Sequence, residues 1–317
     1  MLTKNLWSQI DLKYKSRITG KLLGDGSITK QTGRKPRFQF IHTISDRGWC
    51  EYCYDNLKEV IPLQPPRPRR NIDKRLSKGY SESVQSQSKT STIICYLESQ
   101  WYKDRKKILP TELIEESLTV ESLAWWYQDD GHLKIQNHQP VKIILSTESF
   151  TREENEQLIS LLYKKFHLVF SIDGKNRIAL YNRRSIQYFL HLITPFIHSS
   201  MNRKTFEPLP VFETYPEKRT TLYFSNSLQF KEPTKHINDS LHHLERIWEI
   251  CKSGEFYTSL YPSLLPELNR KGPKRYSYQV KLTSTNTSYL QSLKAYTGLT
   301  YSELTSLCLD IEEGPQN

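Results

Sequence analysis

The chain lacks any long run of apolar residues. Among its 317 residues, no window of about 18 is both uncharged and apolar throughout, and residues 1–11 lack the apolar core of a signal peptide. These absences argue against a membrane-spanning or secreted protein, so we expect an intracellular protein whose compartment the sequence does not specify. Cysteine is also scarce: the five thiols are scattered and odd in number, which argues against a disulfide framework.

Acidic residues are in the minority. The chain carries 45 lysine and arginine residues against 34 aspartate and glutamate residues, a formal net charge of +11. This excess favours a polyanionic partner, and nucleic acid is the first candidate. The 37% content of hydrophobic residues is enough for buried cores, and the length suits two or three domains.

One short pattern occurs twice in the sequence. Residues Ile18–Gly26 and Leu123–Gly131 each form an apolar helical segment that ends in Asp-Gly and leads into residues typical of a strand. Asp25 and Asp130 are separated by the length of a small domain. The repeat therefore predicts two related halves that each contribute one carboxylate to a shared site for hard divalent cations.

The elements around the repeat follow a similar order in both halves. Apolar periodicity, caps and turn residues predict an α+β fold of two halves that follow a similar order of helices and strands. In the first half we expect helices at 16–24, 46–60 and 91–103, strands near 27 and at 36–43 and 80–89, and a proline- and arginine-rich loop at 65–70. In the second half we expect helices at 120–129, 152–166 and 185–193, and strands near 133 and at 141–145, 168–172 and 177–181.

Four segments carry a resemblance to a known family. Residues 122–131, 145–151, 164–168 and 195–204 closely resemble, in this order, segments of the single-chain, two-motif LAGLIDADG homing endonucleases. The resemblance covers about residues 15–225, although Lys21, Leu23 and Trp125 depart from the family pattern. It implies two pseudo-symmetric αββαββα halves that form a DNA-binding saddle of antiparallel sheets. It also implies a monomeric endonuclease that cuts both strands of a long, specific double-stranded DNA target. It also implies a gene linked to an intron or an intein, and we expect an intron because the chain carries no splicing signature of its own.

The two motif helices have faces suited to close packing. Gly20 and Gly24 are four residues apart and share one helical face, which lets another backbone approach closely. The matching face of the second helix carries Trp125 and Asp129. If the helices pack side by side, their terminal aspartates emerge together at one end.

The resemblance assigns catalytic and metal-binding roles around these helix ends. Two or three Mg²⁺ ions are implied at the interface of the motif helices, where water would attack one phosphodiester of each strand. Lys107 and Lys204 match the family lysines near the cleavage centre and would stabilise charge on the phosphate. The predicted catalytic residues are Asp25, Asp130, Lys107 and Lys204. The predicted metal-binding residues are Asp25, Asp130, Gly24 and Asp129. Among these, Asp129 is expected to contact the metal ligands rather than the metal itself.

The strands are the expected DNA readers. A twisted antiparallel sheet can lie along a major groove, and each strand alternates its side chains between the core and the DNA. In the strand at 36–43, Phe38, Phe40 and His42 should face the core. The loop at 65–70 should contact phosphates, through Arg67, Arg69 and Arg70. The predicted base readers are Arg37, Gln39, Thr43, Ser81, Ser83, Gln85, Gln87, Lys89, Lys142, Ser146, Arg177 and Tyr181.

The endonuclease resemblance ends at about residue 224. The remaining chain is predicted to form a helix at 235–252, a connector at 257–273, a strand at 276–282, and helices at 287–296 and 301–311. The last three elements resemble a ribbon-helix-helix module, a dimeric DNA reader in which Ser277, Gln279 and Lys281 would face bases. Two chains would have to pair to complete its two-stranded ribbon. A small helical hairpin without a role in DNA binding fits equally well.

Two other functions fit the same sequence. The first is an RNA-binding splicing maturase, alone or combined with cleavage, whose partner would be intron RNA. The second is a purely DNA-binding regulator that uses the tail, for which Asp25 and Asp130 would have no purpose. The expected domains are the two motif halves at 1–108 and 109–225, a helical connector at 226–273 and the β-α-α accessory domain at 274–317.

Overall fold

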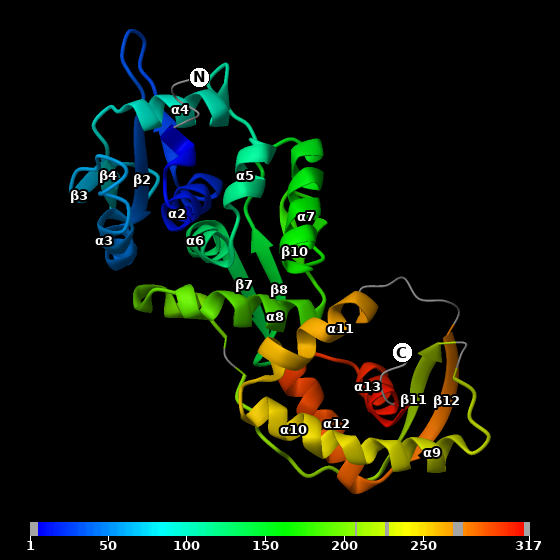
Figure 1. Ribbon diagram of the computed structural model, residues 1–317. Coiled ribbons are helices and arrows are strands. Elements are labelled where there is room, and N and C mark those ends of the chain that lie inside the picture. The colour runs from blue at the N-terminus through cyan, green and yellow to red at the C-terminus, as the bar shows by residue number, and fades with distance from the viewer. Residues whose placement is uncertain (1–5, 207, 226–227, 269–274, 314–317) are drawn as a thin grey trace. The chain divides into compact units, whose positions relative to one another are not determined.

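The computed structural model describes residues 6–206, 208–225, 228–268 and 275–313 (Figure 1). The chain divides into two compact units. The first unit consists of residues 1–181 and 192–205, and the second consists of residues 182–191 and 206–317. No helix in the described ranges is long and apolar enough to cross a membrane.

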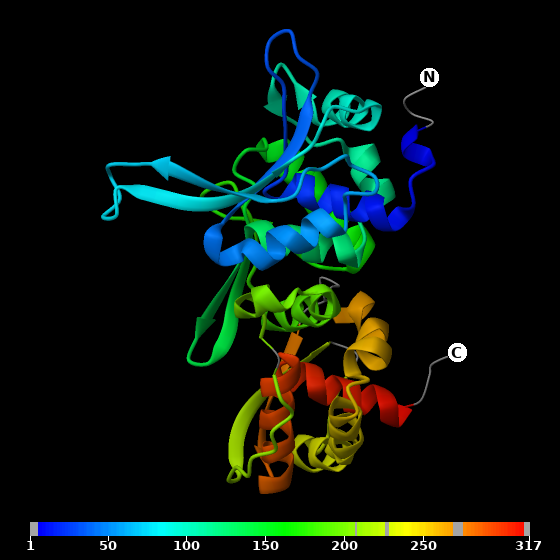
Figure 2. The ribbon, with the colours of Figure 1, turned by 90° about the vertical axis from the view of Figure 1, so that its left-hand side faces the viewer.

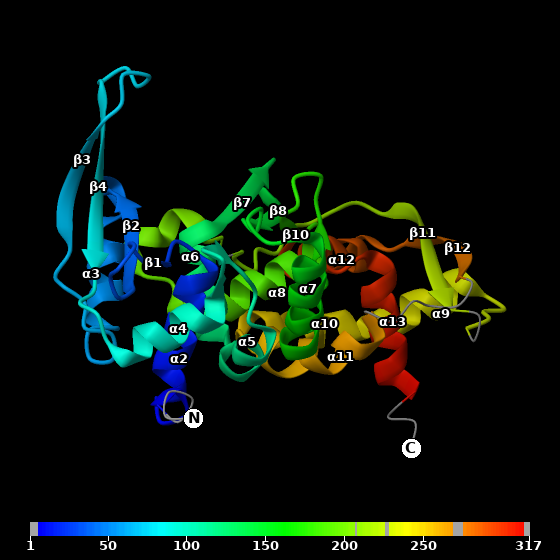
Figure 3. The ribbon, with the colours of Figure 1, turned by 90° about the horizontal axis from the view of Figure 1, so that it is seen from above.

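The first motif half has the order αββαββα. Its four strands form an antiparallel sheet of order β1-β2-β4-β3. Strands β3 and β4 extend as a long hairpin beyond the rest of this sheet (Figures 2 and 3). The elements are α2 (Leu12–Leu23), β1 (Ser27–Thr29), β2 (Arg37–Thr43), α3 (Arg47–Asp55), β3 (Arg67–Ile72), β4 (Tyr80–Gln87) and α4 (Thr92–Trp101).

The second motif half repeats this order. Its antiparallel sheet has the corresponding strand order β7-β8-β10-β9, so the α+β fold of two pseudo-symmetric halves is confirmed. The elements are α6 (Val120–Asp130), β7 (Gly131–Gln136), β8 (Gln139–Leu145), α7 (Arg152–Phe166), β9 (Ser171–Ile172), β10 (Ile178–Leu180) and α8 (Arg183–Ile193). Between the halves lie the short strands β5 (Tyr102–Lys103) and β6 (Lys106–Lys107) and the helix α5 (Thr111–Ser117).

Local sequence explains where the helices of the second half begin. Thr151 caps α7 by accepting a hydrogen bond from the N–H of Glu154, whose side chain accepts one from the N–H of Thr151 in return. This reciprocal capping box satisfies two N–H groups that a helix start leaves unpaired. The Thr119 hydroxyl caps α6 in the same way, with Ser122 as its reciprocal partner.

The motif helices α2 and α6 pack directly against each other. A methyl group added to Gly20 would lie 2.5 Å from the carbonyl oxygen of Ser122, and one added to Gly24 would lie 2.5 Å from the Cβ of Asp129. Real Cβ atoms do not approach so closely, so only glycine at these two positions permits the observed contact. The prediction that these glycines face the second helix is therefore confirmed.

One predicted element of the first half is wrong. Residues 65–70 were expected to form a loop, but Arg67–Ile72 form strand β3, which pairs with β4 over six residue pairs. The strand lies at the edge of the sheet and all six of its residues are exposed. An exposed edge strand tolerates proline and has no apolar alternation, so its sequence resembles that of a loop.

The second unit contains a two-stranded antiparallel ribbon. Strand β12 (Arg275–Leu282) pairs with β11 (Lys218–Ser225) of the same chain over eight residue pairs. The expectation that a second chain must complete this ribbon is therefore wrong, because β11 supplies the missing strand. The helices of the unit are α9 (Pro233–Ser240), α10 (Leu244–Lys252), α11 (Tyr261–Leu268), α12 (Ser284–Thr297) and α13 (Tyr301–Glu313).

The helices of the second unit cover one face of its ribbon. Val280 and Leu282 of β12 and Leu222 and Phe224 of β11 are buried. Residues 226–273, expected to be a connector separate from the β-α-α segment, lie in the same compact unit as that segment. Helix α11 occupies much of the stretch at 257–273 that was expected to be a connector, and residues 269–274 lie outside the described ranges.

Candidate active site and DNA-facing sheets

The two motif aspartates lie at the ends of the paired helices. Asp130 is the last residue of α6, and Asp25 follows the C-cap of α2. Burial, together with repulsion from Asp25 and Asp129, raises the pKa of Asp130 to about 7. The site thus concentrates negative charge where the two helices meet, which suits a divalent cation bound by oxygen ligands.

Asp129 is held by three donors. Its Oδ1 accepts hydrogen bonds from Lys21 Nζ at 2.7 Å and from Trp49 Nε1 at 2.8 Å. Its Oδ2 accepts one from the backbone N–H of Asp25 at 3.1 Å. Burial alone would lower the pKa of Lys21, but the attraction of Asp129 outweighs it and holds this pKa above its ordinary value. The lysine therefore remains an ammonium, and it joins the first motif helix to the second.

His42 connects this ion pair to Asp25. Its Nε2 lies 2.8 Å from Lys21 Nζ, and its Nδ1 lies 3.1 Å from Asp25 Oδ2. Burial would raise the pKa of Asp25, but the hydrogen bond with His42 and the attraction of nearby positive charges hold it below the ordinary value. Asp25 is therefore the more acidic of the two motif aspartates.

Three potential ligand atoms gather here. One atom each from Asp25, His42 and Asp129 lie within 4.8 Å of one another, a spacing that could hold a cation. The Lys21 ammonium, however, contacts both His42 and Asp129, and it would repel a metal ion bound between them. The space between His42 and Asp129 is therefore unfavourable for a cation.

The predicted lysines both contact backbone carbonyls near the motif ends. Lys107 Nζ donates to the Gly26 carbonyl at 3.0 Å, and Lys204 Nζ donates to the Gln128 carbonyl at 2.6 Å. Burial lowers the pKa of Lys107 to about 8 and lowers that of Lys204, against the attraction of the aspartates. The two lysines thus occupy similar places in the two halves.

The exposed face of the first sheet carries a connected row of polar side chains. Phe38, Phe40 and His42 are buried, as the alternation of β2 predicted. On the other face, Gln39 Oε1 accepts hydrogen bonds from the side-chain amides of Gln85 and Gln87, at 3.0 and 2.9 Å. This row therefore runs from β2 to β4.

The strand β3 extends the same row. The register opposes Arg67 to Gln85 and Arg69 to Ser83, so these arginines share the face of the polar row. Arg69 Nη1 donates to Gln85 Oε1 at 3.0 Å. Arg70 lies on the opposite face, where it pairs with Glu82 at 2.9 Å. Arg70 therefore lies on the face opposite to that of Arg67 and Arg69.

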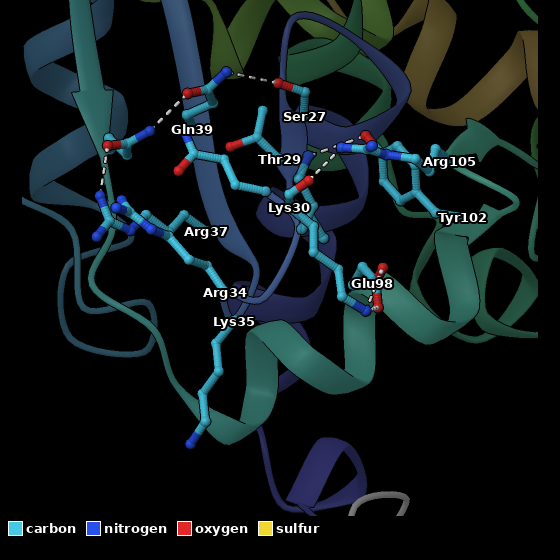
Figure 4. Close-up of a pocket in the computed structure, with 13 residues that line it drawn as sticks. Ser27, Thr29, Lys30, Arg34, Lys35, Arg37, Gln39, Glu98, Tyr102 and Arg105 are labelled. Atoms are coloured by element: carbon cyan, nitrogen blue, oxygen red, sulfur yellow. Dashed lines mark hydrogen bonds and ion pairs between the residues drawn. The ribbon is translucent and has the colours of Figure 1, made fainter.

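A basic pocket of about 590 Å³ opens at the end of this face, between β1, β2 and α4 (Figure 4). Arg37 and Gln39, two predicted readers, line it. Glu98 lies on its wall and pairs with Lys30 at 3.3 Å. The other basic residues that line it are Arg34, Lys35 and Arg105. Positive side chains thus outnumber acidic ones, which suits a phosphate-bearing partner.

The second sheet presents fewer unpaired basic groups. Arg177 pairs with Asp173 at 2.6 Å, and Lys142 lies 3.6 Å from the same carboxylate and over the ring of Tyr181. The hydrogen bond from Arg177 holds the pKa of Asp173 well below its ordinary value. Lys134 of β7 is exposed and opposes Lys142, and the sequence analysis did not select it.

The remaining predicted readers lie in three places. Thr43, Ser81 and Ser83 continue the polar row of the first sheet, and Lys89 is exposed beyond the end of β4. The N–H of Ser146 donates to the Asp130 carbonyl at 3.2 Å. Ser277, Gln279 and Lys281 are exposed in the second unit, on β12.

Sequence reasoning missed three residues of the site. Lys21, His42 and Trp49 are all buried around Asp129 and Asp25. Lys21 was noticeable in the sequence because a charged residue there departs from the apolar pattern of the motif. Its partner, Asp129, is distant in sequence and could not be predicted from a local pattern. His42 was assigned correctly to the buried side of its strand, which concealed its contact with Asp25.

The chain is similar to known proteins in sequence and in fold. The sequence pattern of the LAGLIDADG DNA endonuclease family matches residues 15–189. A probable intron-encoded endonuclease 1 from Wickerhamomyces canadensis is 25% identical over 211 residues, which cover 63% of this chain and 87% of that protein. The intron-encoded endonuclease ai4 from Dictyostelium discoideum is 33% identical over 113 residues, which cover 34% of this chain and 68% of that protein.

A solved structure shares the fold. The homing endonuclease I-WcaI, bound to its DNA recognition sequence, matches 65% of this chain and 92% of its own with a TM-score of 0.55 and 24% identity. This chain therefore has the fold of that endonuclease. The chain belongs to the LAGLIDADG DNA endonuclease family, as the sequence motifs predicted.

Proposed function

We propose that the protein makes Mg²⁺-dependent double-strand breaks at a long DNA target, and that an intron encodes it. The observation that carries this proposal is the meeting of Asp25 and Asp130 at the ends of two closely packed helices. Each half then supplies one carboxylate to a shared centre. The relatives named as intron-encoded endonucleases support the intron as the site of the gene.

The residues at this centre fit Mg²⁺. Asp130 has a pKa raised by burial and by its acidic neighbours, so a divalent cation would relieve unbalanced negative charge there. Asp25 and Asp130 would hold the ions, with the Gly24 backbone beside them. Asp129 would position Asp25, because its own oxygens already accept three hydrogen bonds. Bound Mg²⁺ would activate water and neutralise charge on the scissile phosphate.

Lys107 and Lys204 would stabilise the negative charge that develops on the phosphate. Each is half-buried near the aspartates and remains attracted to them. Their hydrogen bonds to carbonyls at the two motif ends would fix each ammonium at a defined place. A preorganised positive charge costs no rearrangement during the reaction, which is why fixed lysines are effective here.

The exposed face of the first sheet would read bases in the major groove. Glutamine can form bidentate hydrogen bonds with adenine, and arginine with guanine. The side chains that would read bases on this sheet are Arg37, Gln39, Thr43, Arg67, Arg69, Ser81, Ser83, Gln85, Gln87 and Lys89, and in the second half they are Lys142, Ser146, Arg177 and Tyr181. Arg70 would contribute charge rather than sequence reading, because it lies on the other face.

Substitution of the two aspartates tests the proposal. Asp25→Asn and Asp130→Asn should each abolish double-strand cleavage and leave specific DNA binding intact, because an amide retains the shape and loses the charge that holds a cation. Cleavage of an intron-less copy of the host gene, assayed with and without Mg²⁺, is the measurement. Full cleavage by either variant would refute the assignment of the site.

The ribbon of the second unit would provide a second DNA-binding surface. Its exposed face carries three cross-strand pairs, which are Arg219 with Lys281, Thr221 with Gln279, and Tyr223 with Ser277. Like charges directly opposite each other destabilise a sheet. A bound polyanion would reduce the repulsion between Arg219 and Lys281. In the structure the Glu217 carboxylate, 2.5 Å from Lys281 Nζ, partly offsets this repulsion.

The ribbon is complete within one chain. Asn238 bonds to the backbone of Lys281 and Thr283 at the outer edge of β12, and the hydroxyl of Ser302 accepts a hydrogen bond from the N–H of Tyr223 in β11. Helix side chains thus occupy backbone groups at both edges, which leaves less opportunity for edge-to-edge pairing with another chain. We therefore favour a monomer that uses the exposed ribbon face for DNA.

A further inference from the structure

The hydrogen bonds that Lys21 donates determine the tautomer of His42. A lysine ammonium can only donate hydrogen bonds. Lys21 Nζ lies 2.7 Å from Asp129 Oδ1 and 2.8 Å from His42 Nε2, so Nε2 must accept. The proton of the neutral imidazole is then on Nδ1, where it donates to Asp25 Oδ2 at 3.1 Å. This Nδ1–H also prevents His42 from serving as a metal ligand through that atom.

The same group of residues holds the backbone of Asp25. The N–H of Asp25 donates to Asp129 Oδ2, while Asp129 Oδ1 is fixed by Lys21 and Trp49. The side chains of Lys21 and Asp129 have no exposed surface, and that of His42 is 3% exposed. Asp25, whose side chain is partly exposed, is therefore held at both its backbone and its carboxylate by a network of buried side chains.

The second motif has no equivalent network. Trp126 is the fourth residue of its motif, as Lys21 is of the first, and Gly24 precedes Asp25 as Asp129 precedes Asp130. The strand registers oppose Gly131 to Leu145 and, one step beyond the Ser27–Gln39 pair, Gly26 to Phe40. Thr147 is thus the counterpart of His42, and its hydroxyl donates to the Asn176 carbonyl at 3.4 Å.

We propose that Lys21, His42 and Asp129 form a positioning relay for Asp25 alone, so that the two cleavage centres are unequal. The relay leaves the second carboxylate oxygen of Asp25 for the cation and prevents the side chain from rotating away. Asp130 has no such restraint from the corresponding positions. This inference rests on the proposed function, but the state of His42 can be measured without metal or DNA.

Nitrogen-15 NMR of the imidazole tests the relay in the metal-free protein. At neutral pH we expect the Nδ1–H tautomer of His42 in the unaltered chain, and a mixture of tautomers in Lys21→Met. A predominant Nε2–H tautomer, or an imidazolium, in the unaltered chain would overturn the proposal. Retention of the Nδ1–H preference in a folded Lys21→Met variant would overturn the role of Lys21.

Strand-resolved cleavage tests the consequence for the two centres. His42→Ala should slow cleavage of one strand about ten- to a hundredfold, as loss of a hydrogen bond to a charged group allows, so nicked plasmid cut always in the same strand should accumulate. His42→Gln, which keeps an N–H donor, should restore part of the rate. Thr147→Ala is the matched control in the other half and should give no nicked intermediate.

The outcomes are distinguishable from failure of the proposed function. Equal slowing of both strands by His42→Ala, or the same nicking by Thr147→Ala, would overturn the inequality of the centres. Loss of folding in His42→Ala would show as a lost thermal transition, and His42→Gln would then carry the comparison. Cleavage that survives Asp25→Asn would refute the active site itself and leave the NMR result standing.

Discussion

The Lys21 ammonium and the Asp129 carboxylate lie 2.7 Å apart and neither side chain has exposed surface, so a fully buried ion pair joins the two motif helices. One partner comes from each half of the chain. The close approach of the helices at Gly20 and Gly24 excludes water from the pair. The contact between the two motif helices, which assembles the active site, therefore includes this buried ion pair.

Breaking this ion pair should destabilise the protein strongly. Lys21→Met leaves an unpaired buried carboxylate, which typically costs about 3–5 kcal/mol. The double variant Lys21→Met with Asp129→Leu should lose less than the sum of the single changes, because it removes both charges. Urea unfolding measures each free energy. Arg47→Ala, which breaks the exposed pair with Glu51, should cost about 0.3–0.5 kcal/mol and serves as the control. Additive single losses would show that the pair is not coupled.

The polar row of the first sheet should read sequence at single positions. Gln39→Ala or Gln85→Ala should relax discrimination at one or two base pairs by about 1–3 kcal/mol, because a bidentate contact to a base edge is lost. Binding to a library of single-base target variants measures this effect. Arg70→Ala, on the opposite face, should leave base preference unchanged. A uniform loss of affinity across all targets in the glutamine variants would contradict base reading.

The ribbon of the second unit should strengthen binding to long duplexes. Arg219→Ala with Lys281→Ala should weaken binding to a target with long flanks and flatten the slope of log K against log salt by about one to two units, while cleavage of a minimal site is unchanged. Arg246→Ala with Lys252→Ala removes the same charge from α10 and is the control. Equal losses in both double variants would indicate only a net-charge effect.

A preference of the ribbon for RNA would also contradict the assignment. If the ribbon variants bind duplex DNA normally but lose affinity for intron RNA, the surface serves the maturase alternative instead. Gln279→Glu offers a second variant at an exposed position, where a negative charge should repel the phosphate backbone without disturbing the buried residues of β12. Unchanged binding of both nucleic acids in all these variants would assign the unit a structural role.

The stability of the metal-free protein should depend on the protonation of Asp130. Its pKa is about 7 in the folded chain, above the ordinary value of 3.8, so between these values the folded state binds more protons than the unfolded state. Unfolding free energy should therefore fall as pH rises from about 4 to 7 in EDTA, and this contribution should level off at higher pH. Asp130→Asn should remove this part of the pH dependence of the unfolding free energy. Parallel pH profiles for the two proteins would show that the carboxyl is not perturbed.

The sequence by itself determined the elements that depend on local pattern. The repeated Asp-Gly motifs, the αββαββα order of the second half and the buried row of β2 follow from periodicity, caps and turn residues within short segments. The glycines at positions 20 and 24 also indicated which face of α2 contacts the other motif helix. These features are local because they arise from residues a few positions apart.

The tertiary structure decided the features that join distant segments. The partner of Lys21, the contact of His42 with Asp25 and the pairing of β11 with β12 all link positions that no local pattern relates. Strand β3 was missed because an exposed edge strand needs no apolar alternation. A buried ammonium is stable only beside its counter-charge, so its role became visible only when folding placed Asp129 next to it.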